Sequence, residues 1–521
     1  MRSQALNTGH KRLVHRLFGE AGTPKIAIIG GGFGGIGLGV KLIEAGIFSF
    51  TIFEKNESFG GTWWENTYPG AEVDSPSYLY SYSFRPYDWS RNFARQPELL
   101  AYMTQVIEEN GLGPHFQFNT EILSATWDEE THEYEISTST GARSRCHVVV
   151  SAVGLLNVIN YPDWPGLDTF SGPKFHTARW EHEHDLKDKT VALVGTGCTA
   201  AQVIPEIAPV VKQLYVFQRE PGHVMPKGAR NFSNKERSAR RGPVASRIER
   251  LKCFLEGAQV RGTTVPVSGS RLNEKYARLC TDYIHEVFHD RPDLIDKVTP
   301  RYPFYGKRII LADDFYPALR RDNVELIPKA VERVTNNSVV AADGVEREVD
   351  VLVLGTGFQP ANFLAQLEIM GKHGKTLHEV WDDTPRALLG VAVAGFPNFY
   401  MLYGPNSNGG EILFHEEQQM GYIIRALKRM IRQGASAIEL KQSVMDRFNR
   451  WLQRRLRRTS FGRRAVGFKL GYYRSPSGTV VTQWNQGLTL FWLLCKLFGR
   501  FASNAYRHTS PLEAVRESKT S

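Results

Sequence analysis

Two glycine-rich turns, each placed after a short apolar run, constrain the fold of this chain most strongly. The first turn contains Gly30, Gly32 and Gly35 in the spacing G-x-G-x-x-G. A helix-like segment then leads to a second apolar run, residues 50–53, which ends at Glu54. Glycines in this spacing permit a tight turn and let the backbone approach a pyrophosphate at a helix N-terminus. We therefore predict a parallel βαβ unit that binds a dinucleotide.

The second turn has the variant spacing G-x-G-x-x-A and consists of Gly195, Thr196, Gly197, Cys198, Thr199 and Ala200. Predicted strands flank it, and Gln218 and Arg219 follow the second of these strands. Arg219 stands 24 residues after Gly195, which is the offset of Glu54 from Gly30. An acid at this offset favours a free ribose 2′-hydroxyl, whereas an arginine suits a 2′-phosphate. The first site is therefore predicted to bind FAD, and the second site is predicted to bind NADPH.

Two further motifs accompany the turns. Residues 60–74 fit the pattern (A/G)-G-x-W-x-x-x-x-(F/Y)-P-(G/M)-x-x-x-D through Gly60, Gly61, Trp63, Tyr68, Pro69, Gly70 and Asp74. Residues 170–180 fit F-x-G-x-x-x-H-x-x-x-W through Phe170, Gly172, His176 and Trp180. Alone, either stretch could be a loop in which glycines turn the chain and aromatic rings pack. Combined with two dinucleotide sites, the motifs resemble the fingerprints of Baeyer–Villiger monooxygenases, which are class B flavoproteins.

This resemblance covers about residues 24–485 and implies an enzyme that uses FAD, NADPH and O2 to convert a ketone into an ester or lactone through a C4a-peroxyflavin. It implies FAD contacts at Gly61, Trp63, Asp74, Tyr80 and Asn406, and a contact of Lys307 with NADPH. The family's active-site arginine matches Arg308, with Asp74 as its partner. The segment around His176 is expected to couple domain rotation to cofactor handling.

The implied architecture is α/β, with an NADPH domain inserted into an FAD domain and both of them Rossmann-like. The expected parts are an N-terminal extension at 1–23, an FAD domain at 24–155 and 385–521, and an NADPH domain at 156–384 with a helical insertion at about 225–300. Two strand-to-glycine crossings, 151–154 and 354–358, are expected to act as hinges between them.

Composition limits the other possibilities. A chain of 521 residues can form two or three domains. Its net charge of +10 suits an anionic cofactor, and no nucleic-acid recognition motif accompanies the charge. The five cysteines include no C-x-x-C pair, which predicts a reducing cytoplasm and argues against a disulfide reductase. The histidine spacing predicts no metal site.

No run of the sequence is long and apolar enough for an integral membrane span. Residues 488–501 come nearest, but Lys496 and Arg500 interrupt them. Core packing is the default interpretation of this segment, and weak peripheral membrane contact is the alternative. No pattern indicates an oligomeric state.

Two other functions stay open from the sequence. An N- or S-oxygenating flavin monooxygenase is disfavoured by Trp180 and by the motif at 60–74. A flavin-binding sensor without catalysis is disfavoured by the presence of both Arg308 and Asp74. The chain departs from the family pattern at Glu181, Glu220 and Tyr472, and no pattern specifies which ketone is oxidised.

Overall fold

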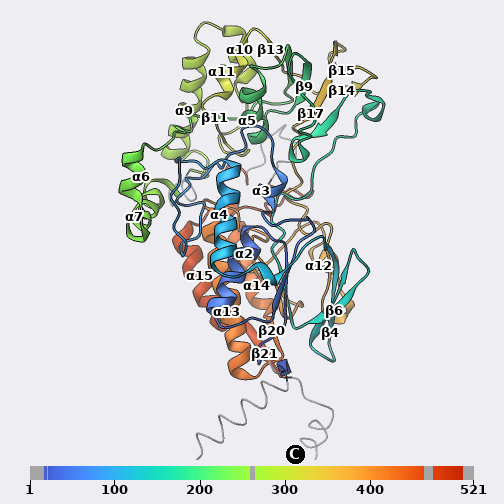
Figure 1. The fold of residues 1–521 in the computed structure, drawn as a ribbon, viewed down its shortest axis with the longest axis vertical. Helices are drawn as coiled ribbons and strands as arrows, with labels where there is room; N and C mark the ends of the chain where they lie inside the picture. The colour runs from blue at the N-terminus through green and yellow to red at the C-terminus, as the bar shows by residue number, and fades with distance from the viewer. Residues whose placement is uncertain (1–16, 20–21, 259–264, 463–472, 508–521) are drawn as a thin grey trace, which may run out of the picture.

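The computed structural model describes residues 17–19, 22–258, 265–462 and 473–507 (Figure 1). Two parallel sheets form the centres of two domains, which are stacked along the long axis of the molecule. Most of the N-terminal extension, as well as Tyr472, lies outside the described residues.

The first sheet has the strand order β19-β7-β1-β2-β3, and every neighbouring pair is parallel. Its strands are β1 (Ile26–Ile29), β2 (Phe50–Phe53), β3 (Phe116–Gln117), β7 (Val148–Ser151) and β19 (Phe399–Met401). All four residues of β1 and of β7 are buried, as expected for parallel strands that are covered on both faces. Helix α2 (Phe33–Glu44) connects β1 to β2, so the predicted βαβ unit is confirmed.

The helices of the first domain pack around this sheet (Figure 1). They are α3 (Thr62–Glu65), α4 (Gln96–Glu109), α12 (Leu377–Trp381), α13 (Ile412–Gln433), α14 (Gln442–Leu456) and α15 (Leu488–Phe501), with the short 3-10 helices η1 (Gly113–His115) and η5 (Lys372–Gly374). Strands β20 (Ala437–Leu440) and β21 (Ser503–Tyr506) form an antiparallel pair beside them. Helix α13 lies against both α2 and α15, so the C-terminal part of the chain completes the first domain.

A smaller sheet of the first domain corrects one predicted boundary. Its strand order is β18-β4-β5-β6, with β4 (Ile122–Asp128), β5 (Glu133–Thr138), β6 (Arg143–Cys146) and β18 (Glu368–Met370). Because β18 pairs in parallel with β4, the chain has returned to the first domain before residue 385. Phe363 and Trp381 already belong to the core of that domain.

The second sheet has the order β13-β10-β9-β17-β8 and is also parallel throughout. Its strands are β8 (Lys174–His176), β9 (Thr190–Val194), β10 (Gln213–Phe217), β13 (Val324–Ile327) and β17 (Val351–Leu354). Helices α5 (Cys198–Ile207) and α11 (Phe315–Leu319) cover it, and a three-stranded antiparallel sheet follows, with β14 (Val331–Val334), β15 (Ser338–Ala341) and β16 (Glu346–Glu348). Two 3-10 helices, η2 (Leu167–Thr169) and η3 (Thr177–Arg179), flank β8.

The helical insertion divides between the two domains (Figure 1). It contains α6 (Asn234–Arg240), α7 (Pro243–Cys253), the π-helix η4 (Phe254–Ala258), α9 (Arg271–Val287) and α10 (Pro292–Val298), and the paired strands β11 (Val224–Met225) and β12 (Ile310–Leu311) flank it. Arg237 in α6 pairs with Asp88, and Arg250 in α7 donates to the carbonyl of Tyr78, so this part lies on the first domain. Helices α9 and α10 instead pack into the core of the second domain.

The outer helix α15 is amphipathic. Leu488, Phe491 and Cys495 are buried, which confirms that this segment packs on the core. Its other face leaves four large apolar side chains exposed, namely Trp492, Leu493, Leu497 and Phe501. In the described part of the chain, no helix is both long enough and apolar enough to cross a bilayer.

The two crossings between the domains run side by side. The amide of Asn160 donates to the carbonyl of Gly357, and the amide of Gln359 donates to the carbonyl of Val158, both at 2.9 Å. Gly154 and Gly357 both have positive φ, at 74° and 79°, a conformation that favours glycine. The domains are therefore joined by a paired, two-stranded connection.

Candidate active site

A cavity of about 1130 Å³ lies between the two domains, at the carboxyl ends of both parallel sheets. It exceeds the roughly 300–1,000 Å³ of ordinary ligand sites. From the first domain, the predicted residues that line it are Gly30, Gly32, Glu54, Gly61, Trp63, Asp74 and Tyr80. From the second domain they are Gly195, Thr196, Gly197, Cys198, Thr199, Ala200, Arg219, Lys307 and Arg308. The fold thus brings both glycine turns to one space that is large enough for two cofactors.

The first turn is shaped for a dinucleotide. A Cβ on Gly35 would collide with the carbonyl oxygen of Gly30, and one on Gly30 would lie 2.6 Å from the carbonyl oxygen of Ala152. Gly35 therefore serves the packing of α2 and does not itself line the cavity. The bare N-terminus of α2 faces the cavity without a side-chain cap, so its amides are left for a pyrophosphate.

Glu54 directly follows β2 and lies on the cavity wall, where the predicted ribose contact requires it. Its Oε2 accepts a hydrogen bond from the amide of Gly31 at 2.7 Å, and its Oε1 accepts from the amide of Asn56 at 3.0 Å. Burial raises the pKa of this carboxyl, and the two backbone donors counteract that effect. The acid is therefore fixed in place beside the first turn and fits the adenosine ribose of FAD.

Trp63, which is buried, and Tyr80, which is partly buried, form an aromatic wall of the cavity. The Trp63 Nε1 donates to the Tyr80 hydroxyl at 3.2 Å, and the two rings meet edge to face with centroids 5.7 Å apart. Burial raises the pKa of the Tyr80 hydroxyl, which keeps its proton. These two residues from the 60–74 motif and its continuation give the first domain a rigid apolar surface at the cavity.

Arg308 and Asp74 meet across the domain boundary. The Arg308 Nη2 lies 2.8 Å from the Asp74 Oδ2. Lys227 approaches the other carboxylate oxygen of Asp74 at 3.9 Å and pairs with Glu72 at 2.6 Å. The side chain of Arg308 is 45% exposed because it opens into the cavity, whereas that of Asp74 is 16% exposed. Asp74 therefore anchors a cation whose free side faces the space between the cofactor turns.

Sequence reasoning missed three polar residues of this boundary. Lys227 is only 3% exposed, and Glu72 lies at an unspecified position of the 60–74 motif. Gln202, one turn into α5, accepts a hydrogen bond from the Tyr68 hydroxyl at 2.9 Å. Only the helical spacing of Gln202 from the second turn could have indicated that it faces the cavity.

The second turn is built like the first. Gly195 has a φ of 118°, and a Cβ there would collide with the carbonyl oxygen of Gly355. Burial raises the pKa of the Cys198 thiol to about 11, so this cysteine is a neutral wall residue rather than a nucleophile.

The predicted phosphate-binding residues lie together at the end of β10. Arg219 is exposed on the cavity wall. Lys307 also lines the cavity, but its ammonium group forms an ion pair with Glu220 and lies 5.0 Å from the ring centre of Tyr302. The departure at Glu220 therefore places an acid beside Lys307, on the same stretch of cavity wall as Arg219.

Besides Gly35, two predicted cofactor residues do not line the cavity. Gln218 is buried and its amide donates to the carbonyl of Lys297 at 2.7 Å. Asn406 is 1% exposed, and its amide donates to the carbonyl of Val480 at 3.0 Å. Both side chains hold neighbouring segments of backbone, so their amide groups are directed into the protein.

The fingerprint residues at 170–180 lie behind the cavity wall. His176 ends β8, is 1% exposed, and accepts a hydrogen bond at Nδ1 from the amide of Ala178. Its ring meets Tyr161 and Phe358, one from each crossing, with centroids 5.6 and 6.0 Å apart. Burial lowers the pKa of His176 to about 4, so the ring is neutral.

The other three fingerprint residues pack within the second domain. Phe170 is buried in the core of the second domain, and a Cβ on Gly172 would collide with the carbonyl oxygen of Asp350. The Trp180 ring packs edge to face on Phe175, at 5.1 Å between centroids. The motif therefore contacts the domain connection through His176 and the second core through its aromatic residues.

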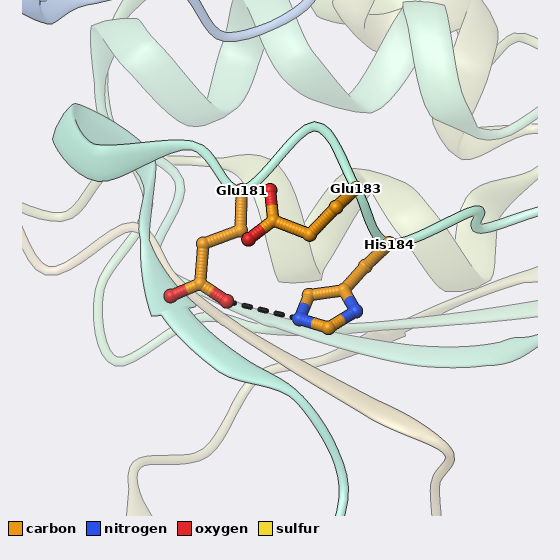
Figure 2. Close-up of side chains that lie close together, drawn as sticks. All are labelled: Glu181, Glu183 and His184. Carbon is orange, nitrogen blue, oxygen red and sulfur yellow. Dashed lines mark ion pairs between the residues drawn. The ribbon is translucent and has the colours of Figure 1, made fainter.

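Among the described residues, one group of acidic and histidine side chains is close enough together to resemble a metal site (Figure 2). It consists of Glu181, Glu183 and His184, directly after the fingerprint. The His184 Nε2 lies 3.0 Å from the Glu181 Oε2, and the two side chains are 35% and 41% exposed. This ion pair explains the proximity of the side chains, and the group lies outside the cavity lining.

Comparisons with known proteins agree with this geometry. A family model described as flavin-binding monooxygenase-like matches residues 23–234. A Baeyer–Villiger monooxygenase of Pseudomonas aeruginosa is 38% identical over 94% of this chain and 93% of its own length. The chain belongs to the Baeyer–Villiger monooxygenase family.

A second family member, from Streptomyces coelicolor, is also 38% identical and covers 88% of each chain. The structure of cyclohexanone monooxygenase from Rhodococcus sp. Phi1 bound to NADP+ is 30% identical, with a TM-score of 0.82 over 93% of this chain and 99% of that one. A steroid monooxygenase bound to NADP is 26% identical, with a TM-score of 0.84 and the same coverage. This Baeyer–Villiger monooxygenase is therefore an FAD- and NADPH-dependent enzyme, as the two glycine turns predicted.

Proposed function

We propose that this enzyme inserts one oxygen atom of O2 beside the carbonyl of a small-molecule ketone, and that Arg308, positioned by Asp74, carries the oxygen-transfer step. The supporting observation is the 2.8 Å contact of Arg308 with Asp74 on the wall of the cavity that both glycine turns share. The named relatives favour this chemistry over N- or S-oxygenation, because they are Baeyer–Villiger and cyclohexanone monooxygenases.

Bound FAD, reduced by NADPH, supplies the oxygen-transferring chemistry when both cofactors are present. The residues of the chain contribute binding and charge. Glu54 holds the ribose of FAD, and Arg219 with Lys307 holds the phosphate of NADPH. The guanidinium of Arg308 stabilises the negative charge that develops on oxygen during the transfer. Asp74 keeps this guanidinium in one orientation, so little reorganisation is needed when the charge appears.

His176 has a different role in this proposal. It contacts an aromatic ring from each domain crossing and reaches no part of the cavity wall. We assign it to transmitting relative motion of the two domains, with the paired crossings as hinges.

The substitution of Arg308 by alanine tests the central assignment. It removes the charge beside the cavity but none of the contacts of Glu54, so FAD content should stay at the wild-type level. Ester formation should fall by about 100-fold or more, as when a single oxyanion-stabilising donor is removed. The measurement is ester produced per FAD, by gas chromatography.

The variant Arg308→Lys serves as the matched control. It keeps the positive charge but not the planar fork, so it should retain part of the activity that Arg308→Ala loses. Wild-type ester formation by Arg308→Ala would show that the assignment is wrong.

Two features of the molecule bear on the compartment in which it works and on contact with a membrane. Cys146, Cys198, Cys280 and Cys495 have free thiol groups, which supports a reducing cytoplasm. The exposed apolar face of α15 carries Lys496 and Arg500, and the helix has no acidic residue. We include in the proposal a weak contact of this face with an anionic membrane surface.

A further inference from the structure

Glu416 is a buried acid on the wall of the cofactor cavity. It lies in the second turn of α13, its residue surface is 7% exposed, and it lines the cavity. Its Oε2 is fully buried and has no hydrogen-bond partner within the described structure. A buried carboxyl without a partner is costly, and more so when it is ionised. Its surroundings therefore favour a neutral acid with a proton to donate.

The carboxyl group faces the first turn of α2. Its Oε1 lies 3.5 Å from the point that a Cβ on Gly34 would occupy, and Ala152 at the end of β7 borders the same point. The N-terminus of α2 is where the pyrophosphate of a dinucleotide binds in this fold. Glu416 thus lies beside Gly34 of the first glycine turn, next to the space that the pyrophosphate of FAD would occupy.

The groups around Glu416 leave it without a compensating cation. On its own helix, the neighbouring Glu417 is also acidic. Across from it, Tyr80 and Tyr82 present hydroxyl groups that stay protonated because burial raises their pKa. The nearby Arg308 pairs with Asp74, and within the described residues no ion pair includes Glu416. Burial, followed by the charge of Glu417, raises the pKa of Glu416 from 4.5 to about 8.

We propose that the protonated carboxyl of Glu416 donates a hydrogen bond to an oxygen of FAD beside the first turn of α2, and that loss of this proton weakens FAD binding. The acceptor is a phosphate or adjoining ribityl oxygen, which share the same acceptor chemistry. A neutral acid donates to such an oxygen, whereas a carboxylate would face a phosphate with like charge. The proposal concerns FAD retention and does not depend on the identity of the ketone.

The expected pH dependence follows because FAD binds the protein in which the Glu416 carboxyl is protonated. FAD affinity should be constant below the pKa of the free protein, about 8, and should fall as the pH rises through that value. Above this point the dissociation constant should increase about tenfold per pH unit, because one proton must be regained for binding.

The experiment measures the dissociation constant of FAD from pH 6 to pH 10, using the fluorescence that FAD regains on release from the holoenzyme. The variant Glu416→Gln keeps a donor but cannot ionise, so its dissociation constant should be flat across this range. Glu416→Leu has no donor and should also be flat, with affinity at pH 7 reduced by about tenfold.

Glu417→Gln is the matched control, since it removes the charge of the adjacent, partly exposed acid. It should keep the wild-type pH dependence, with the break moved to a lower pH because one of the two causes of the raised pKa is gone. A dissociation constant of Glu416→Gln that rises with pH as the wild type does would overturn the proposal. Unchanged affinity of Glu416→Leu at pH 7 would overturn it as well. Because FAD release is the readout, either outcome is separate from a failure of ketone oxidation.

Discussion

Single residues at matched positions distinguish the two nucleotide turns. Glu54 and Arg219 stand at the same offset from the first glycine of their turns, carry opposite charges, and both reach the cavity wall. Glu220, next to Arg219, adds a negative charge to the second site. Glu220 forms an ion pair with Lys307, so two cations and one acid meet where the 2′-phosphate of NADPH is expected.

We predict that Glu220→Gln strengthens the preference of the enzyme for NADPH. The change frees Lys307 for the phosphate, and the KM for NADPH should fall by about three- to tenfold. The gain is modest because the side chain of Glu220 is 42% exposed and the pair is screened by solvent. Steady-state kinetics with NADPH and NADH provide the measurement.

NADH has no phosphate for Lys307 to bind, so its KM should not change in this variant. Arg219→Ala is the matched control, and it should raise the KM for NADPH alone. Equal changes for NADPH and NADH in Glu220→Gln would contradict the prediction.

The glycine turns, Glu54, Arg219 and Asp74 were predictable as neighbours on the cavity wall, because the spacing of a βαβ unit or a long motif fixes their positions in the chain. Arg308 was predicted only through the family resemblance of its segment. Side-chain direction was not predictable. Asn406 and Gln218 occupy plausible positions, but their amides satisfy carbonyls of Val480 and Lys297, which are distant in sequence. Glu416 was missed because a Glu-Glu pair at the start of a helix does not reveal which acid is buried.

At the scale of elements, the parallel strands were the most predictable, because their apolar runs are short and end at glycine or a charged residue. The return to the first domain was predicted too late. Strand β18 has three residues and no distinctive pattern, and only its pairing with β4 shows where it belongs. Helix α13 begins at Ile412, and its His415 is buried against Phe491.

Helix α15 carries a prediction of its own. Leu497 and Phe501 are 47% and 71% exposed on a helix whose charges are all positive. The wild type should sediment with vesicles that contain anionic lipid and should not sediment with purely zwitterionic vesicles. The double change Leu497→Glu and Phe501→Glu should reduce this binding by at least about tenfold, because it removes two apolar anchors and adds negative charge.

Phe48→Glu is the matched control for α15, since Phe48 is 61% exposed outside that helix. It should bind vesicles like the wild type. Absence of wild-type binding to anionic vesicles, or an equal loss in Phe48→Glu, would contradict membrane contact through α15.

At the scale of the whole molecule, polar contacts between the domains surround the cavity. Asp74 meets Arg308, Tyr68 meets Gln202, and Arg179 in the fingerprint pairs with Glu65 in α3 at 3.1 Å. These contacts join the two domains around the cavity that both cofactor turns line. The paired crossings beside His176 are the part of the chain through which the domains would move.

The most direct test of the account uses the holoenzyme with NADPH, isotopically labelled O2 and a panel of cyclic and linear ketones. We predict an ester or lactone that contains one labelled oxygen atom, formed in proportion to the NADPH consumed. The product is identified by mass spectrometry. A parallel reaction offers an amine and a sulfide. Labelled oxygen in the resulting N-oxide or sulfoxide, with every ketone left unchanged, would contradict the account and favour an N- or S-oxygenating enzyme.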